Sequence, residues 1–249
     1  QLGVLSVEHG IVPSDGGTLA TSVETFIATG GTIAFNNGAF SANTLLNSGL
    51  LTIDTRTNDA RSIYGTVQNH DAGYIRTHPD GPVVNSAAGE IHVQLDTNAT
   101  IAFHDAVTNS GLFKVTQKAG TTGGNVYFHD TFTNHGTYLQ DPTTSHFTDL
   151  INNGSLSAGP GDRILASGQV LNHGTIDLAG SHLGALGGIH NLGTISIFDT
   201  ATIDGPILGA GSLVFHVLGD DSHLTLDDPF FGGLQIVFGN GYSPVRNAI

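Results

Sequence analysis

The sequence contains no cysteine, no methionine and no tryptophan. The absence of Cys excludes a disulfide framework, a thiol nucleophile and a thiolate metal site. Basic residues are also scarce, because 7 Lys and Arg stand against 21 Asp and Glu and give a formal net charge of −14. Such a charge argues against nucleic acid or an anionic membrane surface as a partner. No apolar run approaches the roughly 20 residues of a membrane-spanning helix, so membrane insertion is not expected either.

What remains is a chain rich in glycine and in apolar residues. Its 249 residues include 35 Gly, 39% hydrophobic residues and only 11% charged residues, which predicts an ordered fold with many tight turns. The first residue is Gln1 and no charged-then-apolar leader follows it. We interpret the sequence as a mature secreted product whose signal peptide has been removed. The lack of Cys is compatible with an extracellular protein that is stabilised by other means.

A short motif, Asn followed by Gly after one to three intervening residues, recurs along the chain. Its Asn residues are Asn36, Asn47, Asn69, Asn85, Asn109, Asn134, Asn152, Asn172 and Asn191. The Gly residues that follow them are Gly38, Gly49, Gly73, Gly89, Gly111, Gly136, Gly154, Gly174 and Gly193. In all nine copies, the residue two before the Asn and the residue two after the Gly are apolar or aromatic. This spacing by two predicts β-strands with one buried face on both sides of a turn.

The period of the motif predicts how these strands are assembled. From Gly89 onward, successive motif glycines lie 22, 25, 18, 20 and 19 residues apart. A repeat of this length cannot close a core alone and must stack on its neighbours, as in a solenoid. No stretch has the 3.6-residue period of a helix. We therefore predict an all-β fold, a single parallel β-helix with coils of about 20 residues, and right-handed coils from the general rule for β-crossovers.

The motif residues themselves suit the corner of such a coil. Gly permits a sharp turn, and Asn tolerates strained turn geometry while it hydrogen-bonds nearby backbone. In stacked coils each Asn amide can also bond the Asn above and below, which predicts an internal ladder. The structural residues expected to form it are Asn109, Asn134, Asn152, Asn172 and Asn191, each with its corner glycine, Gly111, Gly136, Gly154, Gly174 and Gly193.

Three regions are expected along the chain. Residues 1–31 hold an N-terminal strand and the first coil, and residues 32–205 hold the coils with N-x-G turns. Residues 206–249 lack the motif Asn but keep strand patterns, and we predict that they form closing strands.

Two features resemble known families. The repeated "NxGTI" coils resemble the β-helical stems of autotransporter passengers and filamentous-haemagglutinin-like surface proteins. The C-terminal "SHLTLDDPFFGGLQIVFGNGYSP" is similar to a segment of autotransporter-type and PEP-CTERM-type exoproteins that closes the solenoid. The matching elements are Leu224 to Leu226, Gly232 to Val237, and Gly241 to Pro244.

The resemblance has one departure and one implication. The expected continuation into another strand stops at "VRNAI", without a membrane barrel or a sorting helix, so any such anchor has been cleaved or was never there. The resemblance implies a secreted or surface-attached structural protein or adhesin. These families share no catalytic residues that could be carried over.

One pair of neighbouring repeats places chemically active residues in register. "IAFHDAVTNSG" and "VYFHDTFTNHG" are offset by 25 residues. The pairs that this offset aligns are Phe103 and Phe128, His104 and His129, and Asp105 and Asp130. His with carboxylate suits Zn, Cu or Ni. Because inward Phe side chains would direct the His residues to solvent, we expect a solvated ladder here, and no metal site and no cofactor.

A polysaccharide-processing β-helix enzyme is the alternative from another class. It would need carboxylates, or carboxylates with Lys or Arg, gathered on one face. The acidic pairs Asp220–Asp221 and Asp227–Asp228 lie in expected C-terminal turns, and the few basic residues are scattered. We therefore do not expect an enzyme.

The function predicted from the sequence is that of a secreted structural protein, located outside the cell or at the cell surface. Both ends of a β-helix present open strand edges. The chain opens on "LGVLSV" and ends on "LQIVF" and "RNAI", without a helix that would cap them. We expect head-to-tail self-assembly into a filament, surface layer or matrix, with the chain itself as partner and surface polysaccharide as a further candidate. An adhesin stem is the nearest alternative.

Overall fold

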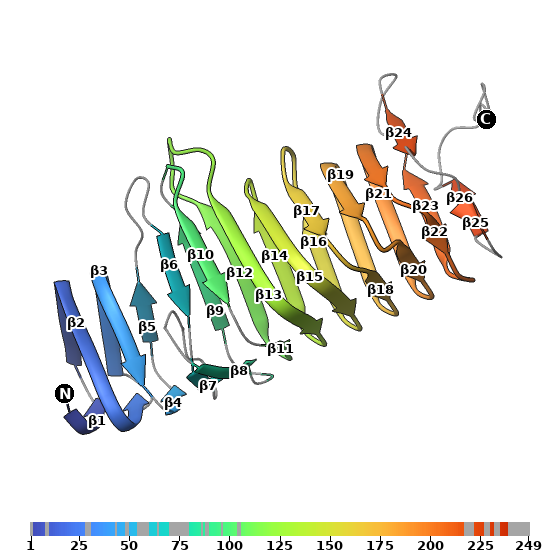
Figure 1. Ribbon diagram of the computed structural model, residues 1–249. Helices are drawn as coiled ribbons and strands as arrows, with labels where there is room; N and C mark the ends of the chain where they lie inside the picture. The colour runs from blue at the N-terminus through green and yellow to red at the C-terminus, as the bar shows by residue number, and fades with distance from the viewer. Residues whose placement is uncertain are drawn as a thin grey trace.

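Most strands of this protein pair in parallel with strands that lie about one coil further along the chain. The computed structural model shows them stacked in order from the N-terminal to the C-terminal part (Figure 1). Adjacent rungs of a parallel β-stack lie about 4.8 Å apart. The coils between Asn134, Asn152, Asn172 and Asn191 take 18, 20 and 19 residues. The predicted all-β parallel β-helix is therefore confirmed, while its handedness stays a prediction.

The structure describes most of the chain, with gaps at several loops and at the C-terminus. The described residues are 2–7, 10–27, 31–42, 44–47, 50–53, 60–63, 65–69, 80–85, 87, 90–95, 97–103, 106–216, 222–226, 230–231 and 235–238. No helix long and apolar enough to cross a bilayer occurs among them.

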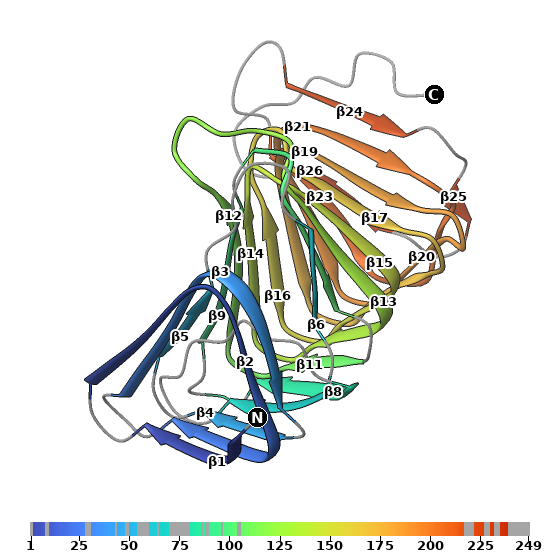
Figure 2. The same ribbon diagram turned by 60° about the vertical axis from the view of Figure 1, so that its left-hand side comes forward.

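The described strands lie on three faces, which can be followed in Figure 2, and the faces differ in their number of rungs, because on face 2 residues 60–63 pair directly with residues 100–103. Face 1 follows the Asn corner. It contains β5 (Leu50–Ile53), β9 (Glu90–Leu95), β12 (Leu112–Gln117), β14 (Thr137–Asp141), β16 (Ser155–Ala158), β23 (Ser212–His216), β26 (Gln235–Phe238) and the first parts of β3 (Gly31–Ala42), β19 (Thr175–Ala185) and β21 (Thr194–Asp204).

Face 2 comes next along each coil. It contains β6 (Ala60–Ile63), β10 (Thr100–Phe103), β17 (Arg163–Ala166), β24 (His223–Leu226), the first parts of β13 (Asn125–Asn134) and β15 (Thr144–Asn152), and the second parts of β3, β19 and β21.

Face 3 leads back to the Asn corner. It contains β1 (Leu2–Val7), the end of β2 (Gly10–Ile27), β4 (Thr44–Asn47), β7 (Gly65–Asn69), β8 (Asp80–Asn85), β11 (Val107–Asn109), β18 (Val170–Asn172), β20 (Ile189–Asn191), β22 (Ile207–Leu208), β25 (Phe230–Phe231) and the second parts of β13 and β15. The strand β2 also runs through faces 1 and 2 of the first coil, where it pairs with β3.

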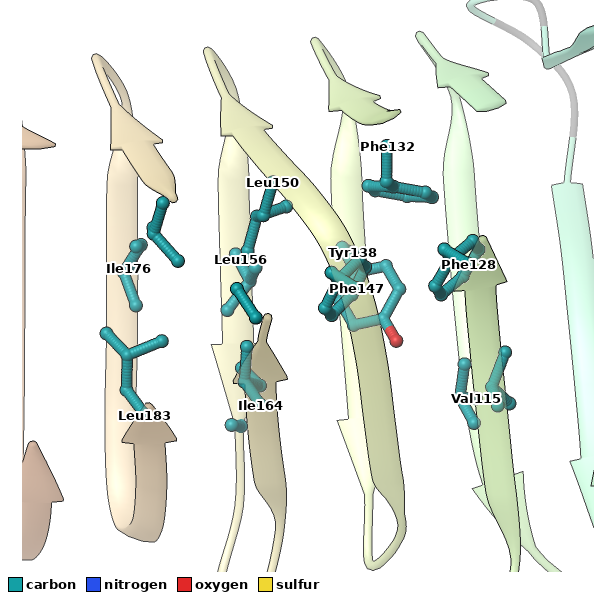
Figure 3. Close-up of a cluster of buried hydrophobic side chains, with 14 of the residues drawn as sticks. Val115, Phe128, Phe132, Tyr138, Phe147, Leu150, Leu156, Ile164, Ile176 and Leu183 are labelled. Atoms are coloured by element: carbon teal, nitrogen blue, oxygen red, sulfur yellow. The ribbon is translucent and has the colours of Figure 1, made fainter. Parts of the chain in front are cut away.

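The core lies between the three faces and is filled by the inward positions that the motif predicts. All of those in the fully described coils are buried: Val107, Phe132, Leu150, Val170 and Ile189 before the Asn, and Phe113, Tyr138, Leu156, Ile176 and Ile195 after the Gly. Figure 3 shows several of these side chains directed toward one another between the strands. Alternation of buried and outward residues along each strand thus produces the core.

Aromatic side chains fill the core around β10 to β15. The ring of Phe128 stacks on Phe103 with centroids 5.0 Å apart and on Phe147 with centroids 4.7 Å apart. Phe132 meets Phe113 edge to face at 5.4 Å. Both arrangements are favourable for aromatic pairs. The register of Phe103 with Phe128 agrees with the offset of 25 residues read from the sequence.

The prediction that Asn36 lies at the same corner as the other motif Asn residues is wrong. Residues Asn47, Asn69 and Asn85 pair with one another at the Asn corner, and the residue in register below them is Ile27. Asn36 lies instead inside β3, near the transition from face 1 to face 2. An Asn followed by Gly is suited to any sharp bend, so the motif alone cannot tell one corner of a coil from another.

The region 206–249 continues the stack as far as it is described. β22 pairs with β25, β23 pairs with β26, and β21 pairs with β24, all in parallel. Two of the segments that resemble a closing element, Leu224 to Leu226 and the end of Gly232 to Val237, therefore form further rungs. The third segment, Gly241 to Pro244, lies outside the described residues.

Candidate functional site

The Asn side chains at the corner form one continuous hydrogen-bonded ladder. Each Nδ2 donates to the Oδ1 of the Asn one coil later, at 2.6 to 2.8 Å, and each side chain is fully buried. The members of the ladder are Asn85, Asn109, Asn134, Asn152, Asn172 and Asn191. All five Asn predicted as structural residues are thus brought together, and Asn85 extends the ladder by one coil.

Each amide also bonds the backbone of the next coil. Asn152 Nδ2 donates to Thr175 O at 2.9 Å, and Asn172 Nδ2 donates to Thr194 O at 3.1 Å. Both N–H groups of the amide are therefore used, as a buried polar side chain requires. The ladder stops at Asn191, whose Nδ2 donates to Ser212 O at 3.0 Å, because Gly209 occupies the next position.

The corner glycines are fixed by close backbone stacking. Gly154 N donates to Asn134 O at 3.0 Å, and Gly174 N donates to Asn152 O at 3.0 Å. A Cβ atom on Gly174 would overlap the carbonyl oxygen of Gly154, and the same holds for Gly154 over Gly136. These positions require Gly because of the close approach of two coils.

The paired His and Asp residues show no metal-site geometry in the described part. His129 and Asp130 are both exposed, and Asp130 Oδ1 accepts a hydrogen bond from Thr131 N at 2.6 Å. His104 and Asp105 lie outside the described residues. The acidic pairs Asp220–Asp221 and Asp227–Asp228 lie outside them as well. Within the described ranges, no group of three or more His, Asp and Glu side chains could hold a metal ion.

A buried polar cluster lies at the corner between faces 1 and 2. Tyr138 OH and Ser145 Oγ are 2.6 Å apart, and Gln140 Nε2 donates to Thr143 O at 2.6 Å. Asp162 accepts from Thr143 N at 2.7 Å through Oδ1 and from Gly159 N at 2.6 Å through Oδ2. This Asp162 cluster holds the turn at residues 159–162 against the preceding coil.

Burial perturbs the acid–base chemistry of this cluster. The pKa of Asp162 is raised to about 6, mainly by desolvation and to a smaller extent by the nearby Asp141 carboxyl, while hydrogen bonds from Thr143 N, Gly159 N and Gln140 act in the opposite direction. Burial also raises the pKa of Tyr138 well above its ordinary value, so its hydroxyl stays protonated. No periodic pattern in the sequence predicts this cluster, since "GPGD" at residues 159–162 is typical of an ordinary turn.

This raised pKa predicts a specific pH dependence of stability. The folded state binds the Asp162 proton more tightly than the unfolded state, whose pKa is near 3.8, so stability should rise as pH falls through about 6 and level off below about 4. We expect the wild type to gain on the order of 1–3 kcal/mol relative to Asp162→Asn between pH 7.5 and 4.5. Urea unfolding at both pH values measures this difference, in which all other titrations cancel. An equal pH response of the two proteins would contradict it.

Fold and ladder together define the class of this protein: a parallel β-solenoid with an internal Asn ladder. Comparison with known proteins adds no closer relationship, because no family model, no curated protein and no solved structure matches the chain.

Proposed function

We propose that this protein is a structural component outside the cell that assembles end to end into a filament, surface layer or matrix. The observation that supports the proposal is the register of the terminal strands. β1 adds to β2, and β26 adds to β23, in the same parallel arrangement as the interior rungs. The stack is therefore built in the same way at its two described ends as in its middle.

Within the described part of the chain, the terminal strands are paired with another strand on one side only. In the part of the chain that the structure describes, β1 pairs with β2 alone, and β24, β25 and β26 each pair with one strand. Unpaired N–H and C=O groups of such an edge are a template for another strand. A second copy that offers its β1 edge to these strands would continue the stack.

Charge favours axial over lateral association. A formal charge of −14 on each chain makes copies repel one another when they approach side by side. An axial contact is made by backbone hydrogen bonds between successive coils, and it brings fewer charged side chains together. Because the contact joins two different surfaces, it repeats without closing and gives a filament.

Deletion of residues 1–12 tests this proposal. The deletion removes β1 and the start of β2, and we expect a folded protein that stays monomeric. Sedimentation and negative-stain imaging of wild type and deletion variant measure the assembly, and circular dichroism checks that the β-structure is retained. Filaments that persist after the deletion, or a wild type that remains monomeric at high concentration, would refute end-to-end assembly through β1.

A further inference from the structure

Two outward columns of the solenoid have the same order of residues over three successive coils. On face 2, Ala102, Tyr127 and His146 are in register, and at the end of face 1, Ala179, Phe198 and His216 are in register. The ring of Tyr127 stacks on His146 with centroids 4.4 Å apart and planes 4° apart. Phe198 stacks on His216 with centroids 4.4 Å apart and planes 3° apart.

The two columns differ on the opposite face of the aromatic ring. Tyr127 has a second ring beside it, His129 at 6.0 Å, and the alanine below it, Ala102, is buried with 8% exposure. Phe198 is partly exposed, and His216 is its only ring contact among the described residues. Since His216 covers one face of Phe198, the other face is directed along the column toward Ala179.

Small residues continue below that free face. Ala179 carries only a methyl group, and one coil further down the column reaches Gly159, which directly follows the last paired residue of β16. A Cβ built on Gly159 would lie 3.9 Å from Asp141 Oδ1, in ordinary contact. The two column positions below Phe198 therefore carry a methyl group and a hydrogen atom, and the exposed Pro160 lies beside them. The exposed Asp141 is the next residue of the column.

The backbone turns directly after Phe198. Asp199 is exposed and has a φ of 70°, a conformation that L-residues other than Asn and Asp seldom adopt. Its Oδ1 accepts a hydrogen bond from Ser222 Oγ at 2.7 Å, so a residue of the next coil holds this carboxyl, one position after Phe198 in the chain. The same corner one coil earlier contains Gly180 with a φ of 64°, so the positive φ belongs to the turn between faces 1 and 2.

We infer that the column of Gly159, Ala179, Phe198 and His216, here called the Phe198 column, binds a neutral polysaccharide. The apolar C–H face of a pyranose ring fits a flat aromatic ring that is open on one side. Because Asp141 lies three coils, about 14 Å, below Phe198, one sugar unit can donate a hydroxyl group to Asp199 and a later unit of the same polysaccharide can donate to Asp141. A few polar groups around an aromatic surface are the usual composition of a small-molecule site. The charge of −14 disfavours an anionic polysaccharide. The inference rests on the proposed location outside the cell for its choice of ligand, and not on end-to-end assembly.

Native affinity electrophoresis tests the inference on the monomeric fraction, so that its result is independent of assembly. Gels at pH 7.5 contain hydroxyethylcellulose, xyloglucan or laminarin as neutral polysaccharides, or polygalacturonate as an anionic one. The acidic protein migrates toward the anode, and binding retards it. We expect retardation by at least one neutral polysaccharide and none by polygalacturonate.

Three variants test whether polysaccharide binding depends on the free face of the Phe198 ring. We expect Phe198→Ala to raise the dissociation constant about tenfold, the loss of one aromatic stacking contact. Ala179→Leu should weaken binding as well, because it covers the ring face and leaves the ring in place. Tyr127→Ala is the matched control, which removes the equivalent stacked ring and should leave binding unchanged. Thermal unfolding confirms that each variant is folded.

Two results would overturn the inference. One is the absence of retardation by all three neutral polysaccharides, in which case the ring pairs serve only as cross-strand contacts that stabilise the sheet. The other is equal retardation of the wild type, Phe198→Ala and Ala179→Leu, which would place binding elsewhere on the protein. Failure of filament formation would leave both readouts unaffected.

Discussion

Gly174→Ala is expected to abolish or severely weaken folding. The added Cβ would overlap Gly154 O and lie 2.8 Å from the carbonyl carbon of Asn153, and both are backbone atoms of the preceding coil. The coils cannot separate there without loss of the bonds from Gly174 N to Asn152 O and from Thr175 N to Gly154 O. Overpacking of a dense interior costs about 1–3 kcal/mol, and a clash with backbone on two sides belongs at or above the upper end.

Gly159→Ala is the matched control for this prediction. Its Cβ would meet Asp162 Oδ2 at 3.6 Å and Asp141 Oδ1 at 3.9 Å, which are ordinary contacts. We expect its free energy of unfolding to stay within about 1 kcal/mol of the wild type, since surface changes without a clash have small effects. Urea unfolding and the yield of soluble protein compare the two variants. Equal stability of Gly174→Ala and Gly159→Ala would show that the coils can move apart at the Asn corner.

The sequence predicts this fold well because the same constraint repeats in every coil. Inward positions on either side of the Asn corner, such as Phe132 and Tyr138, must be apolar in each rung, and stacking aligns them. The exception, Asn36, follows from the same logic. Its copy satisfies the local turn chemistry, but the register with Ile27 and Asn47 is decided by contacts between coils.

The repeat pattern of the sequence does not predict features that occur in only one coil. The Asp162 cluster joins Tyr138, Ser145 and Asp162 across a corner, and none of the three recurs at the same position in the next coil. The Phe198 column likewise depends on which outward residues stack on one another. The number of residues in each corner sets that register, as the irregularity between Ala179 and Ser181 shows.

Removal of one ladder residue should cost less than the glycine substitution but remain clearly measurable. Asn172→Ala takes away the donor to Asn191 Oδ1 and to Thr194 O, and the acceptor of Asn152 Nδ2. An unsatisfied buried group costs about 1–3 kcal/mol, and Asn152 Nδ2 keeps its bond to Thr175 O. We therefore expect a loss of on the order of 1–3 kcal/mol, measured by urea unfolding. Asn153→Ala is the control, because Asn153 is exposed at the same corner and should change stability by less than about 0.5 kcal/mol.

The ladder also predicts how substitutions combine. In Asn152→Ala/Asn172→Ala, the bond between these two residues is lost only once, so the double variant should be more stable than the sum of the single losses predicts. Asn172→Asp should be worse than Asn172→Ala at pH 7, because a buried carboxylate would face the Asn191 and Thr194 oxygens without a proton to donate. Protonation at low pH restores one donor, so the difference between Asp and Ala at this position should shrink. Strict additivity of the two alanine substitutions, together with an Asp variant as stable as the wild type, would show that the ladder bonds contribute nothing to stability.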